Sequence, residues 1–398
     1  MSLNGIRVVD LTRIISGPFC TQLLADLGAD VIKIETIGGD PLRNQGAKVN
    51  GFSWYFAAYN RNKRSVALDL YSDEGKAILK QIIRGADVLV ENYRPGVLDK
   101  MGLSKPELEQ LNPNLIVCNI SGFGASGPYA QRPAFDFIAQ ALSGFMSVNG
   151  VEDEPPIRSG LPISDLVAGL YGALGVVSRL VGRPGPGDAA SGVQNVDISL
   201  TDSMVSLLSY MASDHLAVGK SPVRSGNDHP LVAPYGVFET ADSPIAVAPS
   251  NDGVYAKLLA AMDLQHLHSD PRFLTNADRL TNRGALRDIL APIFASAPSA
   301  HWIERLNKAG VPVGPILSVP EVFEDPQIQH REMMIEVDHG NRGPVQMLGF
   351  PMKFSQDACE IRHAAPTLGQ HGSQVLTEAG FSQVEIDAFA KKGALRQE

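Results

Sequence analysis

The stretches Gly5-Ile-Arg-Val-Val-Asp-Leu11 and Asp30-Val-Ile-Lys-Ile-Glu35 decide the fold. Each is a short apolar run rich in β-branched residues, which is typical of a buried strand. Between them, Ser16-Gly-Pro18 ends the first run, and Cys20 to Leu27 has the pattern of a helix that Gly28 ends. Strand, helix and strand in this order predict a βαβ unit and a parallel sheet that is covered on both faces.

The same alternation continues to about residue 200. We predict further strands at Ser65–Leu70, Asp87–Glu91, Leu115–Ser121 and Asn195–Leu200, and helices at Asp73–Gly85, Ile138–Met146 and Leu166–Leu180. A loop rich in Gly and Pro, residues 182–192, precedes the last of these strands. The pattern predicts an α/β fold with a doubly wound sheet.

The pattern changes from about Gly226. Tyr235 to Ala248 reads as a hairpin, and three amphipathic helices follow around Tyr255, Leu286 and Trp302. We therefore place a large domain at 1–205, a linker at 206–225, a small α/β domain at 226–325, and at 326–398 a linker that returns to the large domain.

Composition excludes several classes of protein. The 398 residues carry a formal net charge of −9, which argues against binding to nucleic acid or to an anionic membrane surface. The first residues have no signal-peptide pattern, and no membrane-spanning run is evident. Three scattered cysteines and nine histidines show no CxxC or HExxH spacing, so we expect no metal, no disulfide framework and a cytoplasmic location.

Asp165 stands in the sharpest local feature, Gly160-Leu-Pro-Ile-Ser-Asp165, before a helix of small residues. One interpretation is a helix cap, because Asp is a preferred residue at that position. The other is an aspartyl nucleophile, kept ionised by the positive end of the helix dipole.

The segment Asn60-Arg-Asn-Lys-Arg-Ser65 concentrates three cations before a strand. It is either a solvated basic loop or part of a cradle for phosphates. The neighbouring aromatic residues 52–56 are either core or a surface for stacking on adenine.

Several motifs occur together in the order found in class III CoA-transferases, and the chain resembles this family over nearly its whole length. They are Asp10-Leu-Thr-Arg…Gly-Pro-Phe19, Ala25–Glu35, Asn60–Ser65, Val90–Gly96, Ser121–Tyr129, Ala134–Ala141, Ser164-Asp165, Asp325-Pro-Gln and Leu368-Gly-Gln-His371.

The resemblance implies a Rossmann-like large domain with an inserted small domain, and an interlocked homodimer. It implies that Asp165 is the nucleophile and that no cofactor is permanently bound, with coenzyme A as a substrate. The residues expected to contact CoA, or to lie beside Asp165, are Ile14, Ile15, Arg43, Leu68, Asn92, Tyr93, Lys100, Arg132, Phe135 and Asp136.

The implied reaction moves CoA from an acyl-CoA to a carboxylic acid through an aspartyl anhydride and an aspartyl-CoA thioester. The sequence pattern is most similar to that of members that use succinyl-CoA and branched dicarboxylates. Arg158 or Arg61 would bind the second carboxylate of the substrate. The family's glycine-rich loop corresponds here to Ala248-Pro-Ser-Asn-Asp-Gly253, which has one glycine.

Two other functions are compatible with such a chain. The family fold also hosts 2-methylacyl-CoA racemases, which need a His and an acidic residue where this sequence has Phe135 and Asn251. A non-catalytic CoA-binding protein is the other alternative, and it would have no need of Asp165.

Overall fold

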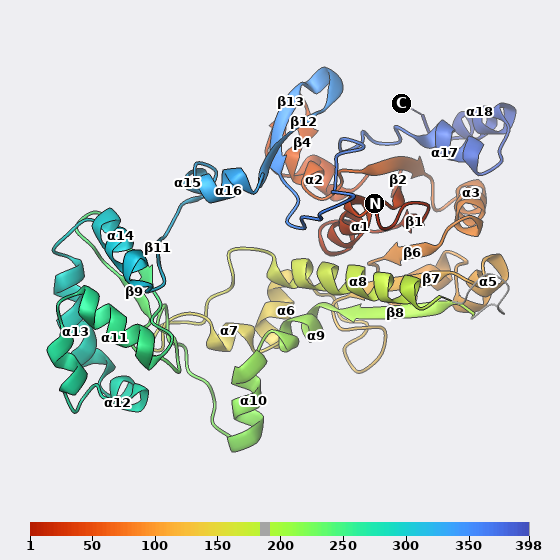
Figure 1. Cartoon of the computed structure of the whole chain (residues 1–398). Helices are drawn as coiled ribbons and strands as arrows, with labels where there is room; N and C mark the ends of the chain where they lie inside the picture. Colours follow the sequence, from red (N-terminus) through yellow and green to blue (C-terminus); the bar gives the residue numbers. More distant parts are fainter. Residues whose placement is uncertain (184–191, 398) are drawn as a thin grey trace. The chain divides into compact units, whose positions relative to one another are not determined.

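The protein is described by a computed structural model covering residues 1–183 and 192–397. It divides into two compact units (Figure 1). The first unit comprises Met1–Met146, Arg158–Lys220 and Gln329–Glu398, and the second comprises Ser147–Ile157 and Ser221–Ile328. Most of the predicted loop at 182–192 lies outside the described residues.

The first unit is built on a seven-stranded sheet with the order β14-β5-β2-β1-β6-β7-β8. Every strand is parallel to its neighbours except β14, which pairs antiparallel with β5. The bounds are β1 Arg7–Asp10, β2 Asp30–Thr36, β5 Lys63–Leu68, β6 Val88–Glu91, β7 Ile116–Ser121, β8 Gln194–Ser199 and β14 Leu395–Arg396. The chain thus builds outward from β1 in both directions, which is the order of dinucleotide-binding sheets. The six parallel strands confirm the strand predictions.

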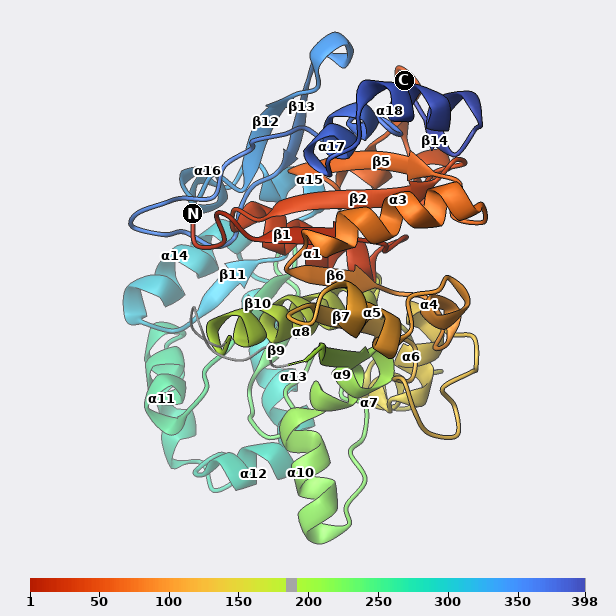
Figure 2. The same ribbon diagram turned by 90° about the vertical axis from the view of Figure 1, so that its right-hand side faces the viewer.

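Helices cover both faces of this sheet (Figure 2). Because side chains alternate along a strand, Val8 joins the apolar cluster of one face and Val9 that of the other. One face packs against α1 (Ser16–Asp26) and α8 (Ile163–Val181). The other packs against α3 Asp73–Arg84, α5 Lys105–Leu111, α17 Gly372–Glu378 and α18 Gln383–Lys391.

Helix α8 carries small residues on the side that meets α1 and the sheet. A Cβ on Gly175 would lie 2.6 Å from Val196, and one on Gly172 would lie 3.0 Å from Ile120. By length and composition this helix could also cross a membrane. One side of it packs on α1 and the sheet, with Ala168, Gly172 and Val176 buried.

The remaining elements of the first unit lie in connecting segments. They are η1 Pro41–Asn44, β3 Lys48–Val49, β4 Phe52–Ser53, α2 Trp54–Ala57, α4 Val97–Lys100, α6 Asp136–Leu142, α9 Leu200–Ser206, α10 Ser209–Val218, β12 Met334–Asp338, η3 Gly340–Arg342 and β13 Pro344–Leu348. Helix α7, Phe145–Val148, spans the boundary between the units. The aromatic stretch at 52–56 forms a small core of its own around Phe52 and Phe56, in agreement with the core interpretation.

The second unit packs helices around a three-stranded sheet of order β11-β10-β9. The predicted hairpin is present as β9 Gly236–Phe238 and β10 Ile245–Val247, with β11 Val313–Pro315 on the far side of β10. The other elements are α11 Asp252–Ala261, η2 Gln265–Ser269, α12 Asn276–Thr281, α13 Arg283–Phe294, α14 Ser299–Ala309, α15 Val319–Val322 and α16 Pro326–His330, the last of which spans the boundary between the units.

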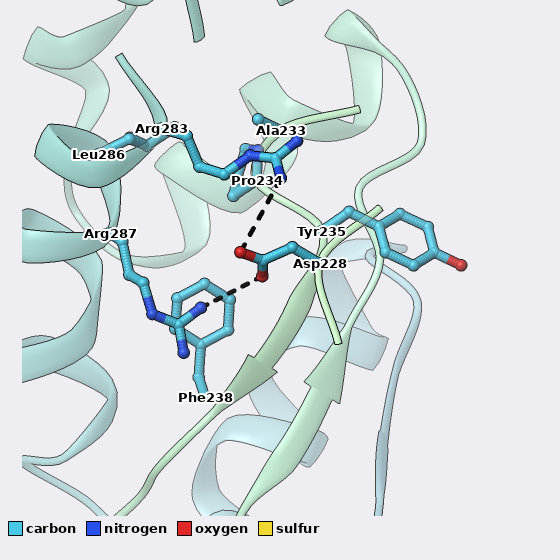
Figure 3. Close-up of a pocket in the computed structure, with 8 residues that line it drawn as sticks. All are labelled: Asp228, Ala233, Pro234, Tyr235, Phe238, Arg283, Leu286 and Arg287. Carbon is cyan, nitrogen blue, oxygen red and sulfur yellow. Dashed lines mark hydrogen bonds and ion pairs between the residues drawn. The ribbon is translucent and has the colours of Figure 1, made fainter. Parts of the chain in front are cut away.

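A cavity in the second unit has a volume of only about 10 Å³. Figure 3 shows that Asp228 lies between Arg283 and Arg287, which approach its carboxylate to 3.9 and 3.3 Å. The three charges fix α13 beside the start of β9, and so little space remains that this cavity is structural.

Candidate active site

Asp165 is the third residue of α8, so the interpretation of Asp165 as the helix cap is wrong. The helix begins two residues earlier, after Pro162, which makes no side-chain capping bond. The amide of Ser164 is instead satisfied from another helix, by the Asp136 carboxylate at 2.9 Å. The Asp165 carboxylate therefore lies in the first turn of α8, where the helix dipole favours a negative charge. It has no capping bond to make.

Asp136 is buried at the start of α6 and holds the beginning of α8 in place. Its carboxylate accepts hydrogen bonds from the amide and hydroxyl of Ser164, both at 2.9 Å, and from Nε2 of Gln140 at 2.7 Å. Gln140 Oε1 in turn accepts from the amide of Ser159 at 2.8 Å. The segment that leads to Asp165 is thus tied to α6 at two points.

Burial, together with the nearby charge of Asp136, raises the pKa of the Asp165 carboxyl to about 7. A hydrogen bond with the Ser16 side chain acts in the opposite direction. Asp165 therefore titrates near neutral pH, as expected of a carboxylate with a chemical role.

Two tyrosines lie within range of the Asp165 charge. Burial raises the pKa of Tyr55 and of Tyr59, and the Asp165 carboxylate contributes to both shifts. The two rings are 6.1 Å apart, and Tyr59 meets Phe19 edge to face at 6.2 Å. From the sequence, Tyr55 was placed only in an aromatic cluster and Tyr59 was not singled out, so neither was connected with Asp165.

The turn between β1 and α1 is held by side chains from elsewhere in the sheet. Ile14 has φ +70°, a conformation that a β-branched residue rarely adopts. Its amide faces the Asp40 carboxylate at 3.3 Å, and Lys33 pairs with Asp40 at 3.2 Å. Asn92 bonds both the amide and the carbonyl of Arg13, at 2.9 and 2.8 Å. Such strain is found mainly where function requires it.

A cavity of about 370 Å³ opens beside this turn, at the carboxyl ends of β1, β2 and β6. In an open α/β sheet this switch point is where ligands bind. Its lining is largely apolar and includes Leu11, Ile34, Leu70, Tyr71, Tyr93, Val97 and Met101.

The charges that line this cavity leave an excess of positive charge. Glu35 is paired with Arg43 at 2.7 Å and Asp40 with Lys33, so both carboxylates are compensated. The three lining cations Arg13, Lys76 and Lys100 form no ion pair within residues 1–183 and 192–397. An apolar cavity with uncompensated cations suits a ligand that carries both an aromatic group and phosphates.

Five of the ten predicted contact residues lie at the cavity or at the adjoining turn. Tyr93 and Lys100 line the cavity, and Ile14, Ile15 and Asn92 belong to the adjoining turn or contact it. Leu68 is buried in the core at the end of β5, and Arg132 is exposed and stacks on Tyr129 at 3.6 Å. Phe135 is 72% exposed, whereas its neighbour Asp136 is buried.

The structure does not bring Arg43 to this cavity. Its guanidinium donates to both oxygens of Glu35 at 2.7 and 2.8 Å and to the carbonyl of Pro366 at 2.9 Å. Arg61 is committed in the same way, with its guanidinium 2.7 Å from Asp26. Of the two arginines considered for a second substrate carboxylate, only Arg158 is exposed and outside any ion pair in the part of the chain described.

Arg13 and Lys76 were missed by the sequence analysis. Each lies outside a cluster of like charges, so no local pattern marks it. Only the strand order, which places β1 next to β2 and β6, brings these cations to the same cavity as Lys100.

The loop Ala248–Gly253 belongs to the second unit. Asn251 caps α11 by accepting from the amide of Val254 at 3.0 Å, and Asp252 pairs with the buried Arg279. The second half of this loop is therefore anchored within its own unit. Among residues 1–183 and 192–397 no group of three metal-binding side chains occurs.

Comparison with known proteins gives one consistent result. The sequence model of CoA-transferase family III matches residues 3–372. The acetyl-CoA:oxalate CoA-transferase of Acetobacter aceti is 41% identical over 378 residues, 94% of this chain and 95% of that protein. The succinyl-CoA:glutarate CoA-transferase of Mus musculus is 35% identical over 398 residues, 99% of this chain and 90% of that protein. A solved CAIB/BAIF family protein from Brucella suis is 38% identical, with a TM-score of 0.83, over 94% of this chain and 98% of that structure.

Proposed function

This chain belongs to CoA-transferase family III, and from that premise we propose that it transfers CoA from an acyl-CoA to a free carboxylic acid with Asp165 as covalent nucleophile. The observation that carries the proposal is the environment of the Asp165 carboxylate. It lies in the first turn of α8, partly exposed, with a pKa of about 7 and next to the turn that borders the cationic cavity.

The first half of the reaction places CoA on the enzyme. An oxygen of Asp165 bonds to the thioester carbon of the donor, and the carbon–sulfur bond breaks, so that CoA leaves as a thiolate with the electron pair. The thiolate then bonds to the side-chain carbonyl carbon of Asp165. The bond from that carbon to the donor acid breaks, and the acid leaves as a carboxylate.

The second half reverses these steps with the acceptor acid. The acceptor carboxylate displaces the thiolate from Asp165 and forms a new anhydride, and the thiolate then attacks the acceptor's carbonyl carbon. Asp165 is released as a carboxylate, and no net proton transfer occurs. A general base is therefore not required, and a thiol of pKa about 8.5 gives a thiolate that leaves readily.

The cavity at the end of β1 would hold CoA as a substrate, with no permanently bound cofactor. Lys100→Ala should weaken CoA binding by about tenfold, because a charge-assisted contact contributes about 1.5–3 kcal/mol. Isothermal titration of CoA checks this, with Lys105→Ala as control, because Lys105 is an exposed residue of α5 paired with Glu109. Equal affinities for Lys100→Ala and the unaltered protein would place the phosphates elsewhere.

We propose succinyl-CoA as donor and a dicarboxylate, such as a branched one, as acceptor. The relatives above are named for oxalate and glutarate, which are both dicarboxylic acids, and this supports a dicarboxylic acid as acceptor. Arg158 is the cation that we propose for the distal carboxylate, since Arg61 is bound to Asp26. An assay of succinyl-CoA against a panel of mono- and dicarboxylic acids tests the proposal. Transfer to no acid in the panel would count against it.

Racemisation of 2-methylacyl-CoA is the alternative, and it predicts exchange of the α-proton. In deuterated water we expect no enzyme-dependent α-deuterium in a chiral 2-methylacyl-CoA, because Phe135 cannot carry a proton. Mass spectrometry of the recovered thioester measures this. Rapid exchange that requires the enzyme would overturn the transferase proposal.

We further propose that the protein is an interlocked homodimer in the cytoplasm. Apolar side chains of the first unit that are more than a third exposed support an extensive partner surface. They include Phe137, Leu142, Leu170, Leu174, Val205, Leu207, Tyr210, Leu216 and Val218, from α6, α8, α9 and α10 and the turn between the last two.

A further inference from the structure

Ser16, the first residue of α1, faces the turn of α8 that carries Asp165. Its side chain is buried, with 5% exposed. Its backbone carbonyl oxygen lies 2.8 Å from the position of a Cβ on Gly169, which is one helical turn from Asp165 on the same face. A side chain at 169 would block this approach. The close packing places the Ser16 side chain near the Asp165 carboxylate, whose pKa it lowers.

The hydroxyl of Ser16 has a second neighbour, which sets its direction. Nδ2 of Asn92 lies 3.4 Å from Ser16 Oγ and can only donate to it. The Asn92 amide is itself fixed by its two bonds to the backbone of Arg13. Because Ser16 Oγ accepts from Asn92, its own proton is free to point to Asp165.

We propose that Ser16 is a second catalytic residue, which donates a hydrogen bond to the Asp165 side chain throughout the transfer, and that Asn92 is its positioning residue. This inference rests on the proposed function. When the thiolate sulfur bonds to the side-chain carbon of Asp165, the electrons of the C=O bond move onto the Asp165 oxygen. When that carbonyl re-forms, the bond to the departing carboxylate breaks. In this proposal the Ser16 hydroxyl donates to that oxygen as it becomes negative.

Loss of the Ser16 hydroxyl should lower the rate of transfer rather than the affinity for the acyl-CoA. A preorganised donor to a developing oxyanion contributes about 10²- to 10³-fold to kcat. CoA is held in the neighbouring cavity by other groups, so its KM should change little. Since the same hydrogen bond opposes the rise in the pKa of Asp165, its loss should move the acidic limb of the pH profile upward.

The test compares Ser16→Ala with Ser16→Thr, which keeps the hydroxyl. We expect Ser16→Ala to lower kcat by about a hundredfold, to leave KM for the acyl-CoA within about twofold, and to shift the acidic limb of kcat/KM to higher pH. Ser16→Thr should recover most of kcat and the original limb. Ser203→Ala is the matched control, because Ser203 is a buried serine of α9 whose hydroxyl bonds a backbone carbonyl at 2.7 Å.

Two results would overturn the inference. One is a Ser16→Ala enzyme with unchanged kcat and an unchanged acidic limb. The other is a loss of kcat that Ser16→Thr does not restore although both variants melt like the unaltered protein. If Ser16→Ala does not fold, Ser16→Gly, which also removes the hydroxyl, replaces it in the comparison.

Asn92 is tested through a double-mutant cycle. If it acts through Ser16, Asn92→Ala should reduce kcat in the unaltered enzyme and have a much smaller effect on kcat in Ser16→Ala. Equal effects in both backgrounds would show that Asn92 acts independently. Failure of the proposed function itself gives a different pattern, in which Asp165→Asn transfers CoA as fast as the unaltered enzyme.

Discussion

Asp165→Asn is expected to lower the rate of CoA transfer by at least about 10⁴-fold, because the amide cannot form the anhydride and removal of a covalent nucleophile costs this much or more. The change keeps the size of the side chain. It also leaves the bonds of Asp136 to Ser164 and Gln140 in place. The loss should therefore appear in kcat while the protein stays folded.

The control for this variant is Asp202→Asn. Asp202 is also an acidic residue in the first turn of a helix, α9, and its side chain is exposed. It should transfer CoA at the unaltered rate. Steady-state kinetics with succinyl-CoA, together with circular dichroism of each variant, distinguishes loss of chemistry from loss of fold. Near-normal turnover by Asp165→Asn would refute the mechanism.

The same substitution should increase stability at alkaline pH. Burial raises the pKa of Asp165 to about 7, whereas an unfolded Asp titrates near 3.9. The folded state thus holds this proton more tightly, so the contribution of Asp165 to stability is greatest below pH 4 and is lost as the pH rises to about 7. Asparagine has no proton to lose and avoids this cost.

We therefore expect Asp165→Asn to gain more stability over the unaltered protein at pH 8 than at pH 5, by about 2 kcal/mol. One pKa unit corresponds to 1.36 kcal/mol, and the partial exposure of the side chain reduces the effect. Urea unfolding at both pH values, at one protein concentration, measures the difference. A gain that is the same at pH 5 and pH 8, or equal to that of Asp202→Asn, would show that Asp165 is not destabilised by its surroundings.

The central parallel strands β1, β2, β5 and β6 were predictable because they are buried on both faces. Val8, Val9, Val31 and Ile32 show why: adjacent residues enter opposite cores, and the strand reads as a continuous apolar run. The start of α8 was not predictable in this way. Local propensity favours Asp165 as the cap. The contact of Asp136 with Ser164, 28 positions apart in the sequence, overrides it.

The environment of Asp165 depends on tertiary contacts that no local pattern records. Ser16 reaches it only because Gly169 lets α1 and α8 approach closely. Arg43 was expected to contact CoA because its position matches a family motif. The ion pair of Arg43 with Glu35, eight residues earlier, could not be predicted from the sequence, because it needs the turn at Pro41–Asn44 to bring the two side chains together.

Trapping the enzyme-bound intermediate tests the central claim most directly. The protein is incubated with succinyl-CoA, treated with hydroxylamine, digested and analysed by mass spectrometry. The account predicts a hydroxamate on Asp165 alone, dependent on the acyl-CoA and absent from Asp165→Asn. A hydroxamate on another residue, or none in an enzyme that is actively transferring CoA, would contradict it.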